Sequence, residues 1–255
     1  MNRCASCSVR WVCLWASVGL SVAGCNEVTG VEPTRELEVE VIEGGFPWAG
    51  IEPVEGVELC HVDTKDLEVK AIDDCTTTDD QGIAGISLPD KAKVAWSLRK
   101  DDYQRVLVPD ITDGSYDPAT TWPLFTDKLL AELCQLLREE LACDYPLDDT
   151  GYGWISVFTR PRREGATFTL VGATGDLFYT APAGRPSPGF ETTTQNGDAL
   201  FINVLPGDVE IRFGGTAEGC TPRQSWPGAG DHTIALPVRE GFHTYVGLNC
   251  LGVAP

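Results

Sequence analysis

The stretch that decides the fold is residues 192–213, which read TTTQNGDALFINVLPGDVEIRF. Thr193 is followed by a polar turn that ends in Gly197, and then by small and large apolar residues in alternation. Glycine adopts the positive φ angle that a tight hairpin turn requires, and an alternation of period two is typical of a strand with one buried face. We therefore expect a β-hairpin here, with one face of its strands in a hydrophobic core.

A second copy of this pattern lies 115 residues earlier in the chain. Residues 77–89 read TTDDQGIAGISLP, with a threonine, a polar turn, a glycine and the same alternation. Thr78 and Gly82 thus correspond to Thr193 and Gly197. A repeat of this length indicates two copies of one domain and not a solenoid of short units.

Short strand-like runs, separated by clusters of Gly, Pro and Asp, fill most of the remaining sequence. In residues 36–41, three apolar residues alternate with three glutamates, which predicts a half-buried strand with an acidic face in water. Further runs of this kind are residues 56–60, 67–72, 83–88, 93–98, 103–108, 155–158 and 165–170. Regular short strands with turn residues between them are typical of an antiparallel β-sandwich.

The turn pattern resembles that of the carboxypeptidase-regulatory-like, or transthyretin-like, β-sandwich, whose signature is T-x-x-x-G-x-A/Y-x-F-x-x-L/V-x-x-G-x-Y. In the second copy the signature positions are filled by Thr193, Gly197, Phe201, Val204 and Gly207, whereas Val209 stands where the signature has tyrosine. The first copy matches as far as Pro89. The resemblance implies a mainly β fold of two tandem transthyretin-like antiparallel β-sandwiches joined by a helical segment. It implies little about function, because such domains occur as non-catalytic appendages of peptidases and receptors and in many bacterial surface lipoproteins.

The expected organisation is a signal peptide (1–24), a tether (25–34), a first sandwich (35–113), a linker (114–150) and a second sandwich (151–255). In the linker, Thr126 is suited to cap the N-terminus of a helix whose first turn holds Asp127. The leucines that follow share one helical face: Leu129, Leu130, Leu133, Leu136, Leu137 and Leu141. We expect this helix to pack across the two sandwiches; the alternative is a helix that docks a partner.

The N-terminus combines two arginines with an apolar stretch of about 13 residues, which suits a signal peptide and is too short for a membrane-spanning helix. It ends in Leu20-Ser-Val-Ala-Gly-Cys25, which resembles a bacterial lipobox. The resemblance implies cleavage after Gly24 and a lipid on Cys25, which would attach the protein to a membrane. The alternative is an ordinary secretory signal. Asn26 is not the aspartate associated with inner-membrane retention, which favours an outer-membrane lipoprotein.

Ten cysteines are present; three lie in the signal peptide and Cys25 takes the lipid, which leaves Cys60, Cys75, Cys134, Cys143, Cys220 and Cys250. An even number in an exported chain indicates structural disulfides, and the mature chain lacks the CxxC spacing of a metal site. Proximity in sequence favours pairing in the order given. A straight helix would separate Cys134 from Cys143 by about 13.5 Å, and a disulfide spans at most about 7 Å. If these two pair, the helix must therefore end and the chain fold back near Ala142.

The composition excludes some classes of partner and favours none of the common enzyme classes. Of 19 basic and 38 acidic residues, two basic ones lie in residues 1–24, so the mature chain has a net charge of −21, which argues against nucleic acid. His61, His232 and His243 include no His-x-His pair, and no nucleophile elbow, P-loop or dinucleotide motif is present. We therefore expect ordinary strand or loop histidines and predict no catalytic, cofactor-binding or metal-binding residue.

Two further groups, one of aspartates and one of aromatic residues, have residue types that occur in binding sites. Asp110–Asp117 has residue types suited to calcium but not the EF-hand spacing, so we expect solvated acidic turns there and at the aspartates 63, 66, 73, 74, 79, 80, 148 and 149. A sugar-stacking surface would draw on the aromatic residues Trp122, Trp154, Trp226, Tyr152 and Tyr179, although packing in the core or between domains is the favoured explanation.

The sequence thus favours a lipid-anchored cell-envelope protein that acts as a non-catalytic binding or structural module, with an envelope protein or polysaccharide as partner. The alternative is an envelope enzyme that acts on carbohydrate or peptide through an unrecognised site. A cluster of His, Asp and Glu in one cleft would favour the enzyme. An unpaired sheet edge would favour the binding module.

Overall fold

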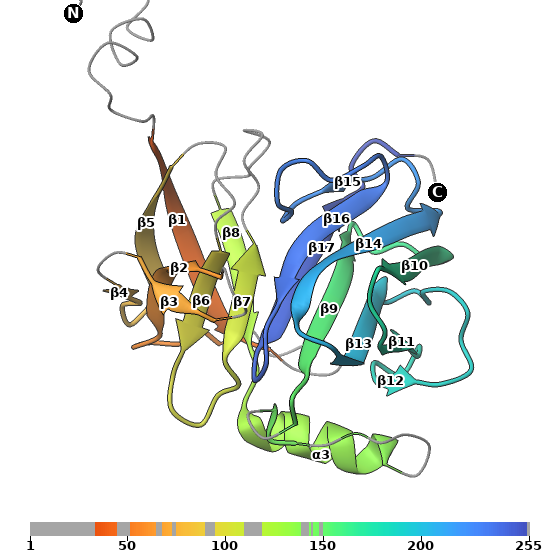
Figure 1. Ribbon diagram of the computed structural model, residues 1–255, viewed down its shortest axis with the longest axis horizontal. Coiled ribbons are helices and arrows are strands. Elements are labelled where there is room, and N and C mark those ends of the chain that lie inside the picture. The colour runs from red at the N-terminus through yellow and green to blue at the C-terminus, as the bar shows by residue number, and fades with distance from the viewer. Residues whose placement is uncertain are drawn as a thin grey trace, which may run out of the picture. The chain divides into compact units, whose positions relative to one another are not determined.

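The computed structural model describes residues 34–44, 52–64, 68–72, 75–89, 95–109, 119–138, 143, 145–147 and 150–253 (Figure 1). The chain divides into two compact units, residues 36–86 with 91–255 and residues 1–35 with 87–90. Of the smaller unit only the ends of two strands are described. The larger unit is mainly β and contains one described helix.

In the N-terminal half, the described residues form eight strands, of which the first and the fifth extend into the smaller unit: β1 (Thr34–Glu43), β2 (Glu58–Asp63), β3 (Lys70–Ala71), β4 (Thr76–Thr77), β5 (Ile83–Pro89), β6 (Ala95–Arg99), β7 (Val106–Pro109) and β8 (Ala119–Leu124). One sheet has the order β5-β1-β8, and the strands β2, β6 and β7 belong to a second. In β1, Leu37, Val39 and Val41 are buried while the glutamates between them are exposed, which confirms the predicted acidic-faced strand. β8 lies within the expected 114–150 linker, and the predicted domain boundaries remain untested.

The C-terminal half contains nine strands: β9 (Gly153–Arg160), β10 (Ala166–Val171), β11 (Asp176–Thr180), β12 (Pro186–Ser187), β13 (Asp198–Val204), β14 (Gly207–Gly215), β15 (Thr221–Pro222), β16 (Thr233–Val238) and β17 (His243–Asn249). A sheet of order β10-β14-β16 faces the strands β12-β11-β13-β9-β17. Side chains from both sheets, among them Ile155, Phe201, Ile211 and Leu236, form one buried cluster between them. This half is a β-sandwich.

Strand β17 joins the two halves. It pairs in parallel with β9 along its length and with β7 at His243 and Thr244, so that one sheet of 11 strands runs through both halves. The expectation of purely antiparallel sheets is therefore wrong, since β1 and β8 are also parallel. Side chains reinforce this junction, which we call the seam: Gln104 Nε2 donates to Gly241 O at 2.7 Å, and Arg239 Nε donates to Thr64 O at 3.0 Å.

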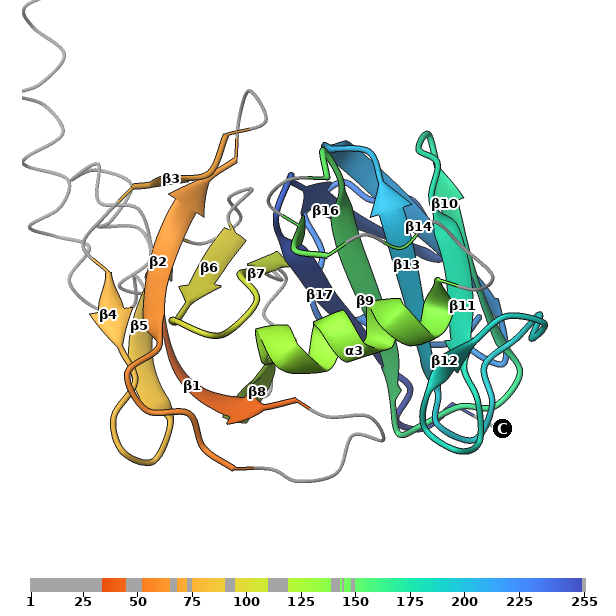
Figure 2. The ribbon, with the colours of Figure 1, turned by 90° about the horizontal axis from the view of Figure 1, so that it is seen from below.

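The helix α3 (Asp127–Leu137) confirms the predicted cap, because Leu129 N donates to Thr126 Oγ1 at 3.3 Å. Its buried residues Leu130, Leu133, Cys134 and Leu137 pack with residues of the C-terminal half, namely Trp154, Phe178, Leu200 and Ile202. Figure 2 shows the helix lying across β9 and β13. The same cluster also contains Phe125, which follows β8, and Leu136, expected on the apolar face, is 57% exposed.

The three predicted disulfides are all present: Cys60–Cys75, Cys134–Cys143 and Cys220–Cys250. The Cα atoms of Cys134 and Cys143 are 5.2 Å apart, so the helix must end between them, as the spacing argument required. It ends at Leu137, and Arg138 Nε donates to Cys143 O where the chain returns. The helix thus ends before the predicted position near residue 142.

The two copies of the turn pattern have matching hydrogen bonds. Gly82 and Gly197 have φ angles of 73° and 70°, the left-handed conformation that favours glycine. Val41 N donates to Gly82 O at 2.7 Å, and Thr159 N donates to Gly197 O at 3.0 Å. Each turn therefore fixes the start of the next strand, β5 or β13, to the end of the first strand of its half.

The threonines of the pattern are also equivalent. Val57 N donates to Thr78 Oγ1 at 2.9 Å, and Ala166 N donates to Thr193 Oγ1 at 2.9 Å. Both threonines are buried. The threonine in each copy thus satisfies a backbone amide at the start of the second strand, which explains why the pattern requires this residue.

Candidate functional site

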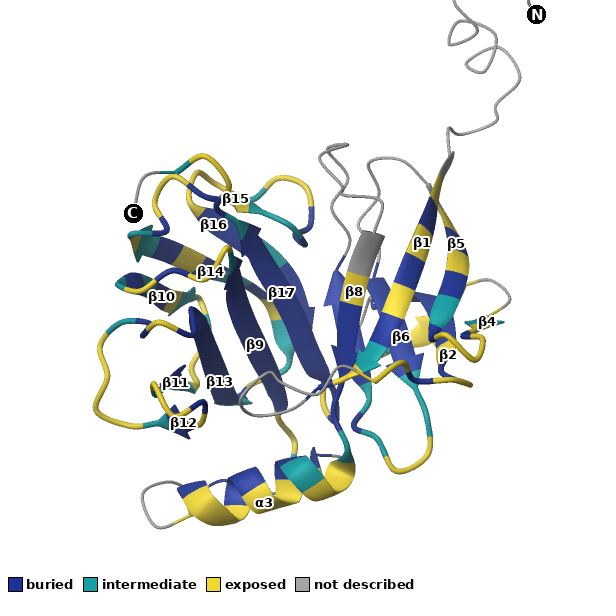
Figure 3. Ribbon diagram, turned by 180° about the vertical axis from the view of Figure 1, so that it is seen from behind, coloured by how far each residue is buried: buried dark blue, intermediate teal, exposed yellow. Residues whose placement is uncertain are grey.

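Among the described residues of the N-terminal half, β5 and β8 each end their sheet, whereas their counterparts β13 and β17 are paired on both sides. In the C-terminal half, β13 lies between β9 and β11, so both of its edges are paired. In the N-terminal half, the equivalent strand β5 pairs with β1 and ends its sheet, and no other strand of the described residues pairs with its outer edge. Figure 3 shows β5 at the margin of its sheet, beside β1. An unpaired strand edge presents a row of backbone donors and acceptors that another strand can bind.

The turn before β5 closes only the first residue of this edge. Ile83 N donates to Asp79 Oδ1 at 2.9 Å, and Asp79 N donates to Ile83 O at 3.0 Å. Gln81 N also donates to Asp79 Oδ1, so this carboxylate organises the turn. Beside Gly85, none of the described residues pairs with this edge. Gly85 is exposed, and a Cβ built on it would meet no atom within 4 Å.

Side chains and loops cover part of both edges of the sheet β10-β14-β16. On β16, Ala235 N donates to Ser225 Oγ at 3.0 Å and Ala235 O accepts from Trp226 N at 2.7 Å. On β10, Phe168 N donates to the hydroxyl of Tyr179 at 3.0 Å. Burial raises the pKa of Tyr179, so this hydroxyl keeps its proton. Side chains and loops therefore occupy backbone groups that another strand would otherwise bind.

A buried nucleophile and base lie at the seam. Ser156 Oγ and His243 Nε2 are 2.8 Å apart, and the imidazole stacks on Phe125 and meets Trp154 edge-on. The exposed fractions of Ser156 and His243 are 2% and 0%. A serine and a histidine at this distance have the geometry of an activated nucleophile, but no substrate reaches a pair that is sealed in this way.

Burial also sets the state of this histidine. It lowers the pKa of His243 to about 3, so the ring is neutral at physiological pH. Nδ1 has no hydrogen-bond partner among the described residues. In the tautomer that donates Nε2–H to Ser156, Nδ1 carries only a lone pair without a partner. The other tautomer would bury an unpaired Nδ1–H, which costs more. The histidine then donates to the serine, which is the reverse of what a general base does.

Most of the other aromatic and histidine candidates are buried. Trp122, Trp154, Trp226 and Tyr179 are at most 4% exposed and Tyr152 is 36% exposed, so packing, and not sugar stacking, accounts for the first four. His61 lies in β2 and stacks on Trp96, and His232 is an exposed loop residue. Cys25, Asp110–Asp117 and most of the other aspartate clusters lie outside the described residues.

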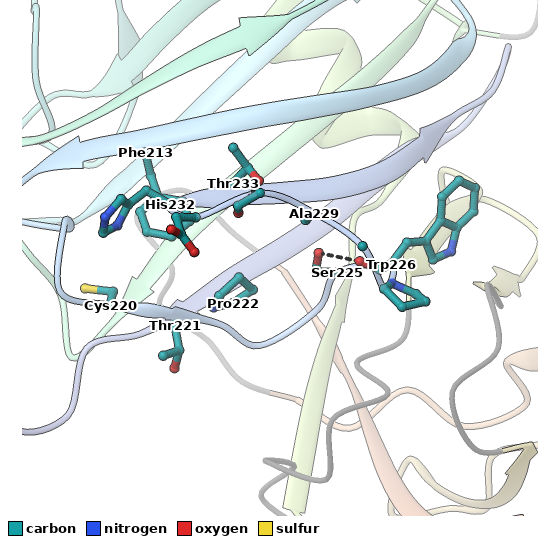
Figure 4. Close-up of a pocket in the computed structure, with 13 residues that line it drawn as sticks. Phe213, Cys220, Thr221, Pro222, Ser225, Trp226, Ala229, His232 and Thr233 are labelled. Carbon is teal, nitrogen blue, oxygen red and sulfur yellow. Dashed lines mark hydrogen bonds between the residues drawn. The ribbon is translucent and has the colours of Figure 1, made fainter.

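Two hollows open on the surface of the larger unit. One, of about 510 Å³, lies among β14, β15 and the loop before β16; Figure 4 shows Phe213, His232 and Pro222 around it and the Trp226 indole turned away. The other, of about 660 Å³, is lined by three basic and three acidic residues: Glu58, Arg99, Lys100, Asp101, Asp102 and Arg105. Their charges balance, so this hollow favours neither anions nor cations.

One group of residues has the spacing of a metal site. Ligand atoms of Glu58, Cys60 and Cys75 lie within 4.8 Å of one another. The two cysteines form a disulfide, so neither offers a thiolate, and the carboxylate alone does not hold an ion. None of the described residues forms a helix with the length and apolar character needed to cross a bilayer.

No family model matches this sequence, and no curated protein matches it either. Among solved structures, the Bacillus anthracis TIE protein is 13% identical with a TM-score of 0.27, over 85% of this chain and 33% of that one. The chain thus spans about a third of the length of that protein. The shaft pilin SpaA from Lactobacillus rhamnosus GG is 11% identical, with a TM-score of 0.26 over 88% of this chain and 100% of that one. The minor pilin GBS52 of Streptococcus agalactiae is 13% identical, with a TM-score of 0.24 over 87% of this chain and 97% of that one. TM-scores this low do not establish a common fold, and no function is transferred from these proteins.

Proposed function

We propose that this chain is a lipid-anchored, non-catalytic binding module of the cell envelope, built from two tandem transthyretin-like sandwiches. The observation that carries the proposal is the open outer edge of β5, beside a counterpart, β13, that is paired on both edges. Natural sheets close or protect their edges, and the partly covered edges of β10 and β16 follow this rule. An edge left open in one half of a repeated fold is therefore suited to bind a partner strand.

The tandem arrangement is supported by the matching turns at Gly82 and Gly197, and export is supported by three disulfides and by the lipobox-like sequence at Cys25. Disulfides form in the periplasm and at cell surfaces. We place the protein in the cell envelope, at the outer membrane, held by the lipid on Cys25. An envelope protein is the favoured partner, because an edge strand binds a backbone of the same kind.

Anchoring is tested with Cys25→Ser. This variant should leave the membrane fraction or remain uncleaved, whereas Cys13→Ser, inside the signal peptide, should still be anchored and should label with a fatty-acid analogue. Acyl label that persists in Cys25→Ser would refute the lipid site.

Binding at the edge is tested by photocrosslinking in intact envelopes. A photoreactive residue is placed at Gln81, in the exposed turn before β5, and in a matched variant at Glu218, an exposed residue of the C-terminal half. We expect an adduct with an envelope protein at position 81 and none at position 218. Equal labelling at both positions, or none at position 81, would contradict a binding role for this edge.

A further inference from the structure

Comparison of the two repeated turns shows which neighbouring strand has no equivalent beside β5 among the described residues. Gly82 and Gly197 are equivalent, so Gly85, three residues after the first, is equivalent to Leu200, three residues after the second. Leu200 is paired with Phe178 of β11. The partner that β11 supplies in the C-terminal half thus has no counterpart beside Gly85 among the described residues.

The direction and register of β5 follow from the turn. Val41 N donates to Gly82 O, which places the start of β5 beside the end of β1, so these strands run in opposite directions. In an antiparallel pair, alternate residues bond to the same neighbour. Gly82 and Ala84 then face β1, and Gly85 directs its N–H and C=O outward, as Ile83 does toward Asp79.

The charge beside this edge selects the incoming strand. Counting along both strands from the Val41–Gly82 bond places Glu38 beside Gly85 on the solvent face, with Glu40 next along β1. Both glutamates are exposed, and Gly85 has no side chain to separate them from a strand added outside it. A strand added outside β5 would lie two strand spacings, about 10 Å, from β1, a distance that an extended Lys or Arg side chain and a glutamate span together. At low salt, opposite charges at this separation attract and like charges repel.

We propose that the open edge of β5 binds an extended segment of an envelope protein in which Lys or Arg alternates with apolar residues. Its backbone takes the place that β11 has beside β13, and its basic side chains lie on the face that carries Glu38 and Glu40. A second copy of this chain would bring another acidic strand and a further net charge of −19, or −21 without residues 1–24, so repulsion disfavours self-pairing. This inference rests on the proposed binding function and specifies its partner.

The test uses the purified full chain in detergent and two probes, a hexapeptide of alternating Val and Lys and one of alternating Val and Glu. We expect the basic peptide to bind at least about tenfold more tightly at low salt and to lose this advantage as salt screens the charges. Glu38→Gln with Glu40→Gln should weaken the basic peptide and leave the acidic one unchanged. Equal affinities of the two peptides for the wild-type chain would overturn the proposed partner class.

The site of binding is tested with Gly85→Pro and its matched control Gly85→Ala. Proline removes the outward N–H and is tolerated on an edge strand, whereas alanine keeps the N–H and meets open space. We expect Gly85→Pro to bind the basic peptide at least about tenfold more weakly than Gly85→Ala, with the same thermal midpoint. Equal binding by the two variants would overturn the assignment to this edge.

Two further outcomes separate this inference from the proposed function. If neither peptide binds while the envelope adduct at position 81 persists, the edge binds a partner of other chemistry and only the basic segment is refuted. If the chain dimerises in sedimentation experiments and Gly85→Pro makes it monomeric, the occupant is a second copy. Either result would overturn the basic partner and leave the binding function in place.

Discussion

In the N-terminal half the strand after the turn glycine ends its sheet, and in the C-terminal half the same strand lies between two others. The segments that precede these strands explain the difference. In residues 172–192, β11 carries Leu177, Phe178 and Tyr179 and pairs with β13. In the N-terminal half, β3 and β4 pair instead with β2, to which the Cys60–Cys75 disulfide also ties this segment. The described part of this connecting segment is thus tied to β2 by strand pairing and by a cross-link, and none of it pairs with β5.

The same comparison shows what the repeat preserves. The threonine, the turn glycine and the bond from the first strand are equivalent in the two halves, whereas the connecting segments, the disulfides and the covering helix are not. The preserved features set the backbone where two strands meet. The variable features decide which edges and faces are covered, and in a binding module these determine what is bound.

The largest expected effect tests the equivalence of the two turns. A Cβ at Gly82 would lie 2.5 Å from Val41 O, and a Cβ at Gly197 would lie 2.5 Å from Thr159 Oγ1, both at positive φ. Gly82→Val and Gly197→Val should each lower the free energy of unfolding by about 3–5 kcal/mol, measured by denaturant titration. Gly85→Ala, in open space, serves as the control and should change it by less than about 0.5 kcal/mol. A large loss at only one of the two turns would break the equivalence.

Much of this fold could be predicted from the sequence, because the signals involved are local. The acidic-faced strand β1, the cap at Thr126, the turn glycines and the three disulfides each depend on residues close together in the chain. The seam could not be predicted, since the β7–β17 pairing joins residues far apart in sequence. The open edge could not be predicted either, because the sequence around Gly85 is that of an ordinary strand. Only the pairing of its counterpart, Leu200, with β11 shows that a neighbouring strand is missing.

The disulfides sharpen the comparison between the halves. Their sequence separations are 30 for Cys220–Cys250, 15 for Cys60–Cys75 and 9 for Cys134–Cys143. Loop-closure entropy predicts that replacing each pair by serine lowers the free energy of unfolding by about 3.6, 3.0 and 2.6 kcal/mol respectively. Removing the Cys60–Cys75 bridge should also release the connecting segment from β2, allow it to reach the edge of β5 and weaken peptide binding there. Unchanged peptide binding in that variant would show that the disulfide does not affect access to the edge of β5.

The seam is tested at Arg239, which is 2% exposed and donates to Thr64 O in the N-terminal half and to Gly207 O in the C-terminal half. Its guanidinium also pairs with Asp208 at 2.9 Å. Arg239→Met leaves these carbonyls without their donor and should lower the free energy of unfolding by about 2–3 kcal/mol. Arg212→Met, at an exposed position of β14, is the matched control and should be nearly neutral. Equal stability of the two variants would show that Arg239 does not hold the halves together.

The smallest expected effect is a pH dependence that arises at the seam. Burial lowers the pKa of His243 from 6.5 to about 3, so below pH 6.5 the unfolded chain binds a proton that the folded chain does not. Stability is therefore complete above pH 6.5 and is lost as the pH falls toward 3. The loss from this residue between pH 7.5 and pH 5 is about 2 kcal/mol, a range in which most carboxylates stay ionised. His243→Leu should flatten the dependence of unfolding free energy on pH over this range, whatever its effect at pH 7.5, while the exposed His232→Gln should not. If His243→Leu and the wild-type chain show the same slope of unfolding free energy against pH, the histidine is accessible to solvent. The Ser156–His243 pair would then again be a candidate nucleophile and base.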